Sequence, residues 1–193
     1  CAERFALEGG SVVIGDINDE LAAATAAAIE SKGGTAHAVH LDAPSSPSNA
    51  ELFRTALDKY GRLDAVVAAA GLSHASYVSG ESAPRGNEGL LDQSVEEWQR
   101  VLDVNLTGVM LADQQAAKVM IEAGNGGTIV NIASAAAKVP LRTAIDYSVS
   151  KAAVAMLTKA FALEAIEHGI RVNGVNPDGV VQGSGIFSGG WGA

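Results

Sequence analysis

Short apolar runs alternate with amphipathic helical runs along the chain, and this alternation restricts the possible folds more than any other feature of the sequence. The helical runs close on glycine, a usual helix stop signal. Mostly unbroken apolar runs are typical of parallel strands in a sheet that has helices on both faces. We therefore expect an α/β fold with a doubly wound parallel sheet, in a single domain over residues 1–193. The expected strands are 11–18, 35–42, 63–71, 127–134 and 170–177, and the main expected helices are 19–34, 46–61, 94–124 and 144–169.

Charge and cysteine content narrow the range of partners. Lys and Arg number 13 against 22 Asp and Glu, a formal net charge of −9, so we expect no nucleic-acid partner. The apolar runs are interrupted well before the ~18 residues that a membrane span needs, so we expect no membrane association. The single cysteine, Cys1, excludes an internal disulfide and suits a reducing compartment, which favours a cytoplasmic location.

Polar residues follow the expected strands, at the edge where ligands of doubly wound sheets bind. Asp16 could accept the ribose hydroxyls of a nucleotide or serve as an acid at a helix N-terminus, and both interpretations stay open. Ser134, taken by itself, is better explained as a helix N-cap. The full set at this edge is Asp16, Asp42, Gly71, Ser134 and Asn176.

Three further polar residues lie on the two long expected helices. Asn105 lies inside the first helix, where asparagine is a poor helix former, so it would mark a local kink or a held water. Tyr147 and Lys151 are four residues apart and share one face of the second helix. Such a pair alone is more often an ordinary helix pair, but the combination with Asn105 and Ser134 is far more specific.

The order Asn105, Ser134 and Tyr147-x-x-x-Lys151 on consecutive elements closely resembles the short-chain dehydrogenase/reductase family. The resemblance runs over nearly the whole chain, in the pieces "GDIN", "LD", "AAAG", "DVNLTG", "IVNIAS", "YSVSK" and "RVNGVNP". It implies a Rossmann-like three-layer sandwich. It also implies an oxidoreductase that transfers a hydride between a nicotinamide cofactor and a small secondary alcohol or carbonyl substrate.

The resemblance implies a catalytic role for each of these four residues. Tyr147 would be the general acid/base, and the ammonium group of Lys151 would favour its phenolate form. Lys151 would also bond the nicotinamide ribose. Ser134 would hold the substrate oxygen, and Asn105 would hold a water that links Lys151 to solvent. No metal is expected.

The resemblance also implies the cofactor contacts. Asp16 would bind the adenosine ribose and repel a 2′-phosphate, and no arginine or lysine stands directly beside it, so we expect NAD rather than NADP. Asp42 would contact the adenine. The expected cofactor-binding residues are Asp16, Ile17, Leu41, Asp42, Ala69, Ala70, Gly71, Asn105, Ile132, Tyr147, Lys151, Pro177 and Gly179.

Several departures from the family pattern carry expectations of their own. The family's first strand and its glycine-rich turn have no counterpart here, so we expect a chain truncated at both ends. Strands 11–16 and 63–70 would then either have a gap between them or pair with each other directly and abnormally. The family's Asn-Asn-Ala-Gly is Ala-Ala-Ala-Gly at 68–71, which concerns stability more than catalysis, and its Asn-Pro-Gly is Asn-Pro-Asp-Gly at 176–179. The tail "NPDGVVQGSGIF" also resembles the dehydrogenase half of bifunctional aldolase–dehydrogenases.

Two other classes of function compete with an enzyme. A non-catalytic nucleotide-binding regulator on the same fold is the alternative, and it would be expected to lack part of the Asn–Ser–Tyr–Lys set. An interaction module is compatible with an enzyme, because helices 94–124 and 144–169 would join a homodimer or homotetramer as in the family. Substrate specificity is expected in segment 72–93, which is long for a connection inside a compact domain, and in the segment after 183.

Overall fold

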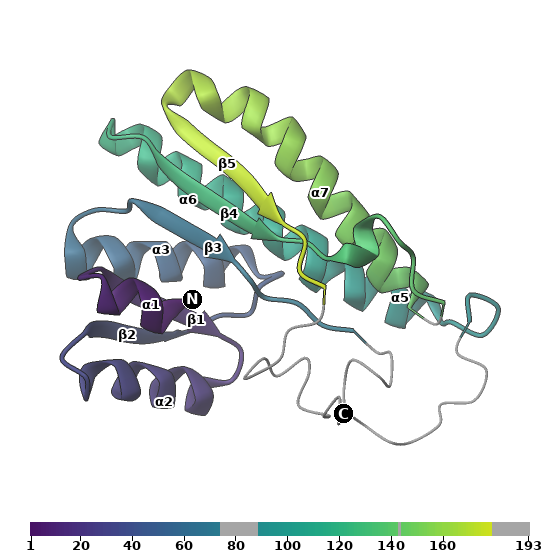
Figure 1. The fold of residues 1–193 in the computed structure, drawn as a ribbon, viewed down its shortest axis with the longest axis horizontal. Helices are drawn as coiled ribbons and strands as arrows, with labels where there is room; N and C mark the ends of the chain where they lie inside the picture. The colour runs from purple at the N-terminus through teal and green to yellow at the C-terminus, as the bar shows by residue number, and fades with distance from the viewer. Residues whose placement is uncertain (74–88, 143, 179–193) are drawn as a thin grey trace.

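Parallel strands alternate with helices throughout the computed structural model, which describes residues 1–73, 89–142 and 144–178 (Figure 1). Each strand pairing is parallel, which confirms the α/β fold that the alternation predicts. In chain order the elements are α1 (Ala2–Leu7), β1 (Ser11–Asp16), α2 (Asp19–Glu30), β2 (Thr35–His40), α3 (Ser46–Tyr60), β3 (Ala65–Ala68), α5 (Val95–Leu102), the π-helical turn η1 (Asp103–Thr107), α6 (Gly108–Ala123), β4 (Gly127–Ile132), the 3-10 turn η2 (Ala135–Ala137), α7 (Ile145–Ala165), the 3-10 turn η3 (Ile166–His168) and β5 (Ile170–Val175).

Local signals in the sequence set most of the helix ends. The side chains of Asn18 and Ser45 accept hydrogen bonds from the first turns of α2 and α3, as N-cap residues do. Helices α3 and α6 end at Gly61 and Gly124, both in the left-handed conformation that glycine adopts without steric cost. These ends explain why the boundaries expected from the sequence agree closely with the observed ones.

The strands form two separate sheets in the described part of the chain. Strands β1 and β2 form one pair, and β3, β4 and β5 form a second sheet in that order, with no pairing between β1 and β3 (Figure 1). This is the gap that the comparison with the family pattern predicts. The gap also corrects the expectation of buried strands at 11–18 and 63–71. No residue of β1 is fully buried and only Ala68 of β3 is, because one edge of each strand has no neighbouring strand.

Helix α3 joins the two sheets into one unit. Its Phe53 packs in a core with Met120 of α6, Ile129 of β4 and Ile170 of β5. On the other side, the Leu52 side chain lies against β1, where a Cβ built on Gly15 would come within 3.0 Å of it. One helix therefore contributes to the cores of both sheets.

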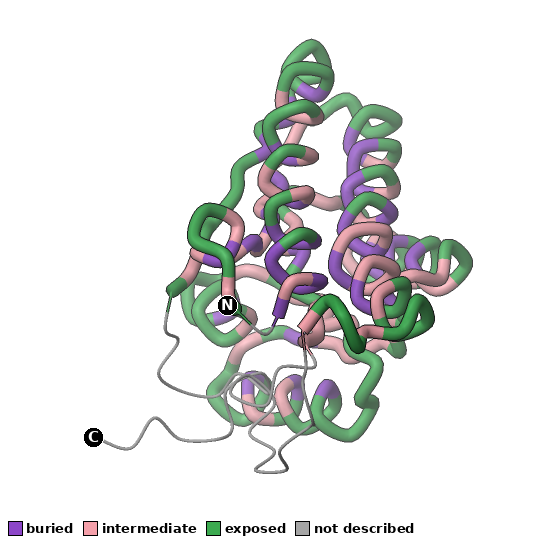
Figure 2. Tube along the Cα trace, turned by 90° about the vertical axis from the view of Figure 1, so that its right-hand side faces the viewer, coloured by how far each residue is buried: buried purple, intermediate pink, exposed green. Residues whose placement is uncertain are grey.

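Helices cover both faces of the β1–β2 pair but only one face of the second sheet in the described residues. Helices α1 and α2 pack on one face of β1–β2 through Ala6 and Ile29, and α3 packs on the other. Helices α3, α6 and α7 share the Ile129 face of the second sheet. The buried residues accordingly lie along the inner sides of these helices (Figure 2). The three-layer arrangement that the sequence predicts is thus seen at β1–β2.

The single helix expected over 94–124 is three segments, α5, η1 and α6. The widened turn η1 contains Asn105, whose side chain bonds to groups outside the helix. Gly108 begins α6 against the loop after β2, where a Cβ would lie 2.9 Å from the Cβ of Ala43. No described helix has the length and the apolar character that crossing a membrane would need.

Candidate active site

The carboxyl ends of the strands in each parallel sheet point to one edge, and the expected site residues lie there. Asp16 ends β1, Gly71 lies in the turn after β3, and Ser134 follows β4. The long α7 helix runs back from this edge and carries Tyr147 and Lys151 in its first two turns. The parallel topology is therefore what collects these residues.

Lys151 lies at the centre of the site. Its Nζ atom donates a hydrogen bond of 2.8 Å to the backbone oxygen of Ile132, at the end of β4. The residue is only 3% exposed, and burial lowers the pKa of its ammonium group from 10.5 to about 8. The Ile132 carbonyl therefore fixes the position of a cation that the protein keeps largely out of water.

Tyr147 lies on the same face of α7, as the four-residue spacing predicts. Its ring centroid is 5.6 Å from Lys151 Nζ, and its side chain packs with Ala136, Ala144 and Leu141. Tyr147 is 8% exposed. An ammonium at this distance from the centroid is within reach of a cation–π contact with the ring. The two side chains therefore lie together on one face of α7.

The Asn105 side chain connects three parts of the site. Its Oδ1 accepts from the Leu72 amide at 2.8 Å, and its Nδ2 donates to the Leu72 carbonyl at 2.9 Å and to Ser150 Oγ at 3.0 Å. Asn105 is fully buried. Its side chain therefore ties the turn after β3 to α7. The role in holding a water stays a prediction.

Gly71 lies close to the polar side-chain atoms of Asn105 and Lys151. A Cβ atom built there would lie 3.3 Å from Asn105 Oδ1 and 3.4 Å from Lys151 Nζ. A side chain there would press on Asn105 Oδ1 and would be in ordinary contact with Lys151 Nζ. The glycine of the "AAAG" piece thus lies in contact with two of the four expected catalytic residues.

Ser134 caps the short turn η2. Its Oγ accepts a hydrogen bond of 3.1 Å from the Ala136 amide, as the interpretation of this residue as an N-cap predicts. The backbone nearby is held to the end of β5, because the Ala135 amide donates to the Pro177 carbonyl at 2.8 Å. A serine hydroxyl keeps its own hydrogen when it accepts a bond, so capping and substrate binding are compatible.

The expected cofactor residues on β1 and β2 lie at an exposed edge. Asp16 Oδ1 accepts from the Asn18 amide at 2.9 Å, and the Asp16 carbonyl accepts from the Leu41 amide at 2.9 Å. Ile17 is 63% exposed, and the Asp42 amide donates to Ser48 Oγ. Ala69 and Ala70 are exposed, whereas Gly179 lies outside the described residues, as do 74–88 of the expected specificity segment and the segment after 183.

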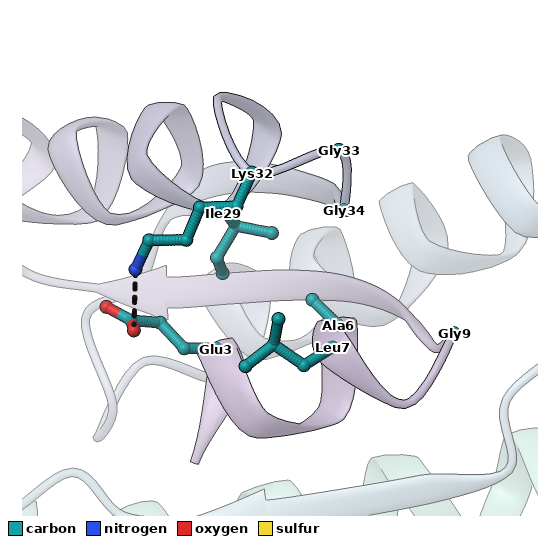
Figure 3. Close-up of a pocket in the computed structure, with 8 residues that line it drawn as sticks. All are labelled: Glu3, Ala6, Leu7, Gly9, Ile29, Lys32, Gly33 and Gly34. Carbon is teal, nitrogen blue, oxygen red and sulfur yellow. Dashed lines mark hydrogen bonds and ion pairs between the residues drawn. The ribbon is translucent and has the colours of Figure 1, made fainter.

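A pocket lies between α1 and α2, and none of the expected site residues line it (Figure 3). Gly9 and Gly34, which line it, come just before the starts of β1 and β2, so part of the pocket lies at the amino ends of these strands. An ion pair of 3.2 Å between Lys32 and Glu3 bridges two of its walls. Ligands of such sheets bind at the carboxyl ends, so this pocket is not the expected site.

Two residues next to the expected catalytic set were not identified from the sequence. Asp146 is buried and precedes Tyr147, and its Oδ2 accepts from Gln93 Nε2 at 2.6 Å. Ser150 donates to the Tyr147 carbonyl at 2.7 Å and accepts from Asn105. The signal for Asp146 was an acid in the first turn of a helix whose N-cap position, Ala144, cannot cap. Among the described residues, no group of three His, Cys, Asp or Glu is placed to hold a metal ion.

Comparison with known proteins agrees with the fold. A family model described as "short chain dehydrogenase" matches residues 1–185. The chain therefore belongs to the short-chain dehydrogenase family.

The relatives are dehydrogenases that are longer than this chain. It is 35% identical over 179 residues to a 2,5-dichloro-2,5-cyclohexadiene-1,4-diol dehydrogenase of Sphingobium indicum, covering 93% of this chain and 66% of that protein. It is 40% identical over 177 residues to 3beta-hydroxysteroid dehydrogenase 1 of Eggerthella lenta, covering 91% of this chain and 63% of that protein. A short chain dehydrogenase from Mycobacterium smegmatis has a similar crystal structure, with a TM-score of 0.82, 35% identity, and coverage of 92% of this chain and 69% of that one.

The described residues fit the nicotinamide cofactor that the family implies. The exposed Asp16 carboxylate can accept hydrogen bonds from ribose hydroxyls, and it stands where a doubly wound sheet binds its ligand. At the other end of the edge, Gly71 leaves the surroundings of Lys151 free of a further side chain. A carboxylate at one strand end and a buried ammonium near another are thus both present, as the resemblance implies for the two riboses.

Proposed function

We propose that this protein is an oxidoreductase that interconverts a secondary alcohol and a carbonyl compound with a nicotinamide cofactor. The observation that carries the proposal is the buried Tyr147–Lys151 pair on α7, with 5.6 Å between the ring centroid and Nζ. When bound, the nicotinamide would accept a hydride from the alcohol carbon or return it to the carbonyl.

Each residue has a defined task in this proposal. The phenol oxygen of Tyr147 takes the hydroxyl proton of the alcohol, or returns it during reduction. The Lys151 ammonium, fixed by the Ile132 carbonyl at 2.8 Å, stabilises the phenolate. Ser134 uses its free hydroxyl hydrogen to hold the substrate oxygen while its Oγ caps η2. Asn105 keeps the turn after β3 in place against α7.

NAD is the proposed cofactor in preference to NADP. The Asp16 carboxylate is exposed at the end of β1, and a 2′-phosphate placed near it would meet like charge. The cofactor residues at the other strand ends would be those named from the sequence. Asp16 is therefore the residue on which this preference depends.

Self-association through the two long helices is part of the proposal. Exposed Val149, Met156 and Leu163 recur every seven residues on α7, which aligns them along one side of the helix. Met110 and Ile121 are exposed on α6. Burial of these apolar side chains would favour a homodimer or a homotetramer. Light scattering of the full-length protein, compared with the variant Met156→Glu, tests this arrangement.

We also propose that the chain forms a single domain and that the protein is cytoplasmic. The packing of α3 against both sheets supports one domain. Cys1 is exposed and free, which is compatible with a reducing compartment.

A substrate panel tests the function. The substrates in the names of both relatives are ring compounds that carry hydroxyl groups. Cyclic secondary alcohols are therefore the first compounds to try. We expect the full-length protein to reduce NAD⁺ with at least one of them, followed at the nicotinamide absorbance. NAD⁺ binding without turnover across alcohols and carbonyl compounds would instead favour the non-catalytic regulator.

A further inference from the structure

The first turn of α7 is stabilised in an unusual way. Its N-cap residue, Ala144, has no side-chain oxygen, although the first N–H groups of a helix need acceptors. Asp146 supplies one from inside the helix, because its Oδ1 accepts the backbone N–H of Tyr147 at 2.7 Å. A carboxylate at this end also interacts favourably with the helix dipole. The acceptor that begins the helix is thus bonded to the backbone of the proposed acid/base itself.

The second oxygen of the same carboxylate is also held. Gln93 Nε2 donates to Asp146 Oδ2 at 2.6 Å, across 53 residues of sequence. Gln93 directly precedes Ser94, the N-cap of α5, whose Oγ accepts from the Glu97 amide at 3.1 Å. Asp146 is 4% exposed, so this contact is made away from water. The start of α5 is therefore connected through one carboxylate to the backbone of Tyr147.

We propose that Asp146 is a positioning residue for Tyr147, and that its hydrogen bond with Gln93 sets the direction in which the Tyr147 side chain points. This role rests on the proposed function. Loss of the Gln93 donor would let the carboxylate turn away from the Tyr147 amide, and the first turn of α7 would then lose an acceptor that holds Tyr147 in place. With Gln93 on the second oxygen, both ends of the carboxylate are fixed. A displacement of about 1 Å at a reacting group can reduce a rate by about a hundredfold.

Exchange of the donor and the acceptor tests the bond. Gln93→Glu places a second carboxylate opposite Asp146 and removes the donor. The double variant Gln93→Glu/Asp146→Asn restores the pair with its direction reversed, because the new asparagine amide donates to the new glutamate. The asparagine oxygen can still accept from the Tyr147 amide, and the net charge equals that of the wild type.

The full-length protein is assayed for kcat, for KM of NAD⁺ and of the alcohol, and for thermal unfolding. We expect Gln93→Glu to lower kcat by about tenfold or more, with KM for NAD⁺ changed by less than about threefold. The double variant should recover most of the lost kcat. The matched control is Gln99→Glu, because exposed Gln99 likewise donates to a carboxylate, that of Asp103 at 2.7 Å, but one that lies outside α7. It should leave kcat within about twofold of wild type.

The possible results separate the two proposals. A lower unfolding temperature of Gln93→Glu with an unchanged kcat would show that the pair only stabilises the helix start, and the positioning role would be overturned. The same conclusion follows if the double variant regains stability but not kcat. If wild type shows no nicotinamide-dependent turnover with any alcohol or carbonyl compound, the proposed function fails, and the positioning role fails with it.

Discussion

Asn131 on β4 and Asp113 on α6 form a buried polar pair in which Asn131 Nδ2 donates to Asp113 Oδ2 at 2.9 Å. Asn131 also donates to Thr158 Oγ1 on α7 at 3.1 Å, so the pair connects a central strand to two helices. The other oxygens, Asp113 Oδ1 and Asn131 Oδ1, have no hydrogen-bond partner among the described residues. Burial raises the pKa of Asp113 from 3.8 to about 6, against the smaller opposite effect of the bond from Asn131.

Asp113→Asn should therefore stabilise the protein at neutral pH. Because the pKa of Asp113 is higher in the folded state, its stabilising contribution is complete below pH 3.8 and is lost as the pH rises to about 6. At pH 7 the ionised group then costs on the order of 2–3 kcal/mol, which the neutral amide avoids. Urea unfolding at pH 5 and pH 7 measures the effect, with Glu122→Gln on the exposed side of α6 as the control. A variant less stable than wild type at pH 7 would show that Asp113 is held as an anion.

Lys151→Met should remove a rise in stability at alkaline pH. The pKa of Lys151 is about 8 in the folded state and 10.5 ordinarily, so between these values the unfolded state binds more protons. The free energy of unfolding then increases with pH across this window, by on the order of 3 kcal/mol. Urea unfolding from pH 7.5 to 10.5 should show the increase in wild type and in the control Lys159→Met, an exposed lysine of α7, but not in Lys151→Met. Equal slopes in all three proteins would contradict burial of the ammonium.

Tyr147→Phe should abolish turnover and leave cofactor affinity nearly unchanged. The hydroxyl acts only in proton transfer, and loss of a general acid/base lowers a rate by about 10²–10⁴-fold. The ring itself, which packs with Ala136 and Ala144, is kept in the variant. Steady-state kinetics and NAD⁺ titration of the full-length protein measure the two quantities separately. Activity within a few-fold of wild type would remove Tyr147 from the role of acid/base.

Asp16 should make the protein prefer NAD⁺. A carboxylate at the end of β1 accepts ribose hydroxyls and repels a 2′-phosphate, so kcat/KM should be higher for NAD⁺ than for NADP⁺. Asp16→Ala should narrow this preference, whereas Asp64→Ala, an exposed carboxylate before β3 that pairs with Arg62, should not. An equal or higher kcat/KM for NADP⁺ in wild type would show that the proposed ribose contact is wrong.

The 193-residue chain alone should either unfold over a broad temperature range or bind NAD⁺ more weakly than in the micromolar range. Strands β1 and β3 each have an edge without a strand partner in the described structure. Each buried backbone group left unpaired costs about 1–3 kcal/mol, against a total stability of about 5–15 kcal/mol for a domain. Calorimetry and NAD⁺ titration decide the matter. A sharp transition together with micromolar binding would mean that the gap costs little.

Much of the architecture could be predicted because it depends on short-range patterns. Cap residues such as Asn18 and Ser45, and glycines such as Gly61 and Gly124, act within one helical turn, so their effect is local. The spacing of Tyr147 and Lys151 places both on one face wherever their helix lies. The gap between β1 and β3 was also expected, from the comparison with the family pattern.

The sequence by itself determined the alternating strands and helices, the helix ends and the shared face of Tyr147 and Lys151. These features depend only on residue order and local geometry. Only the tertiary structure decided the contacts that hold these residues in place. The π-helical turn at Asn105 depends on partners 33 and 45 positions away, and the Asp146–Gln93 bond spans 53 positions. The burial that shifts the pKa of Asp113 likewise arises where strand and helices meet. Hydrogen bonding and desolvation depend on distances in space, and those distances exist only once the strands and helices have packed together.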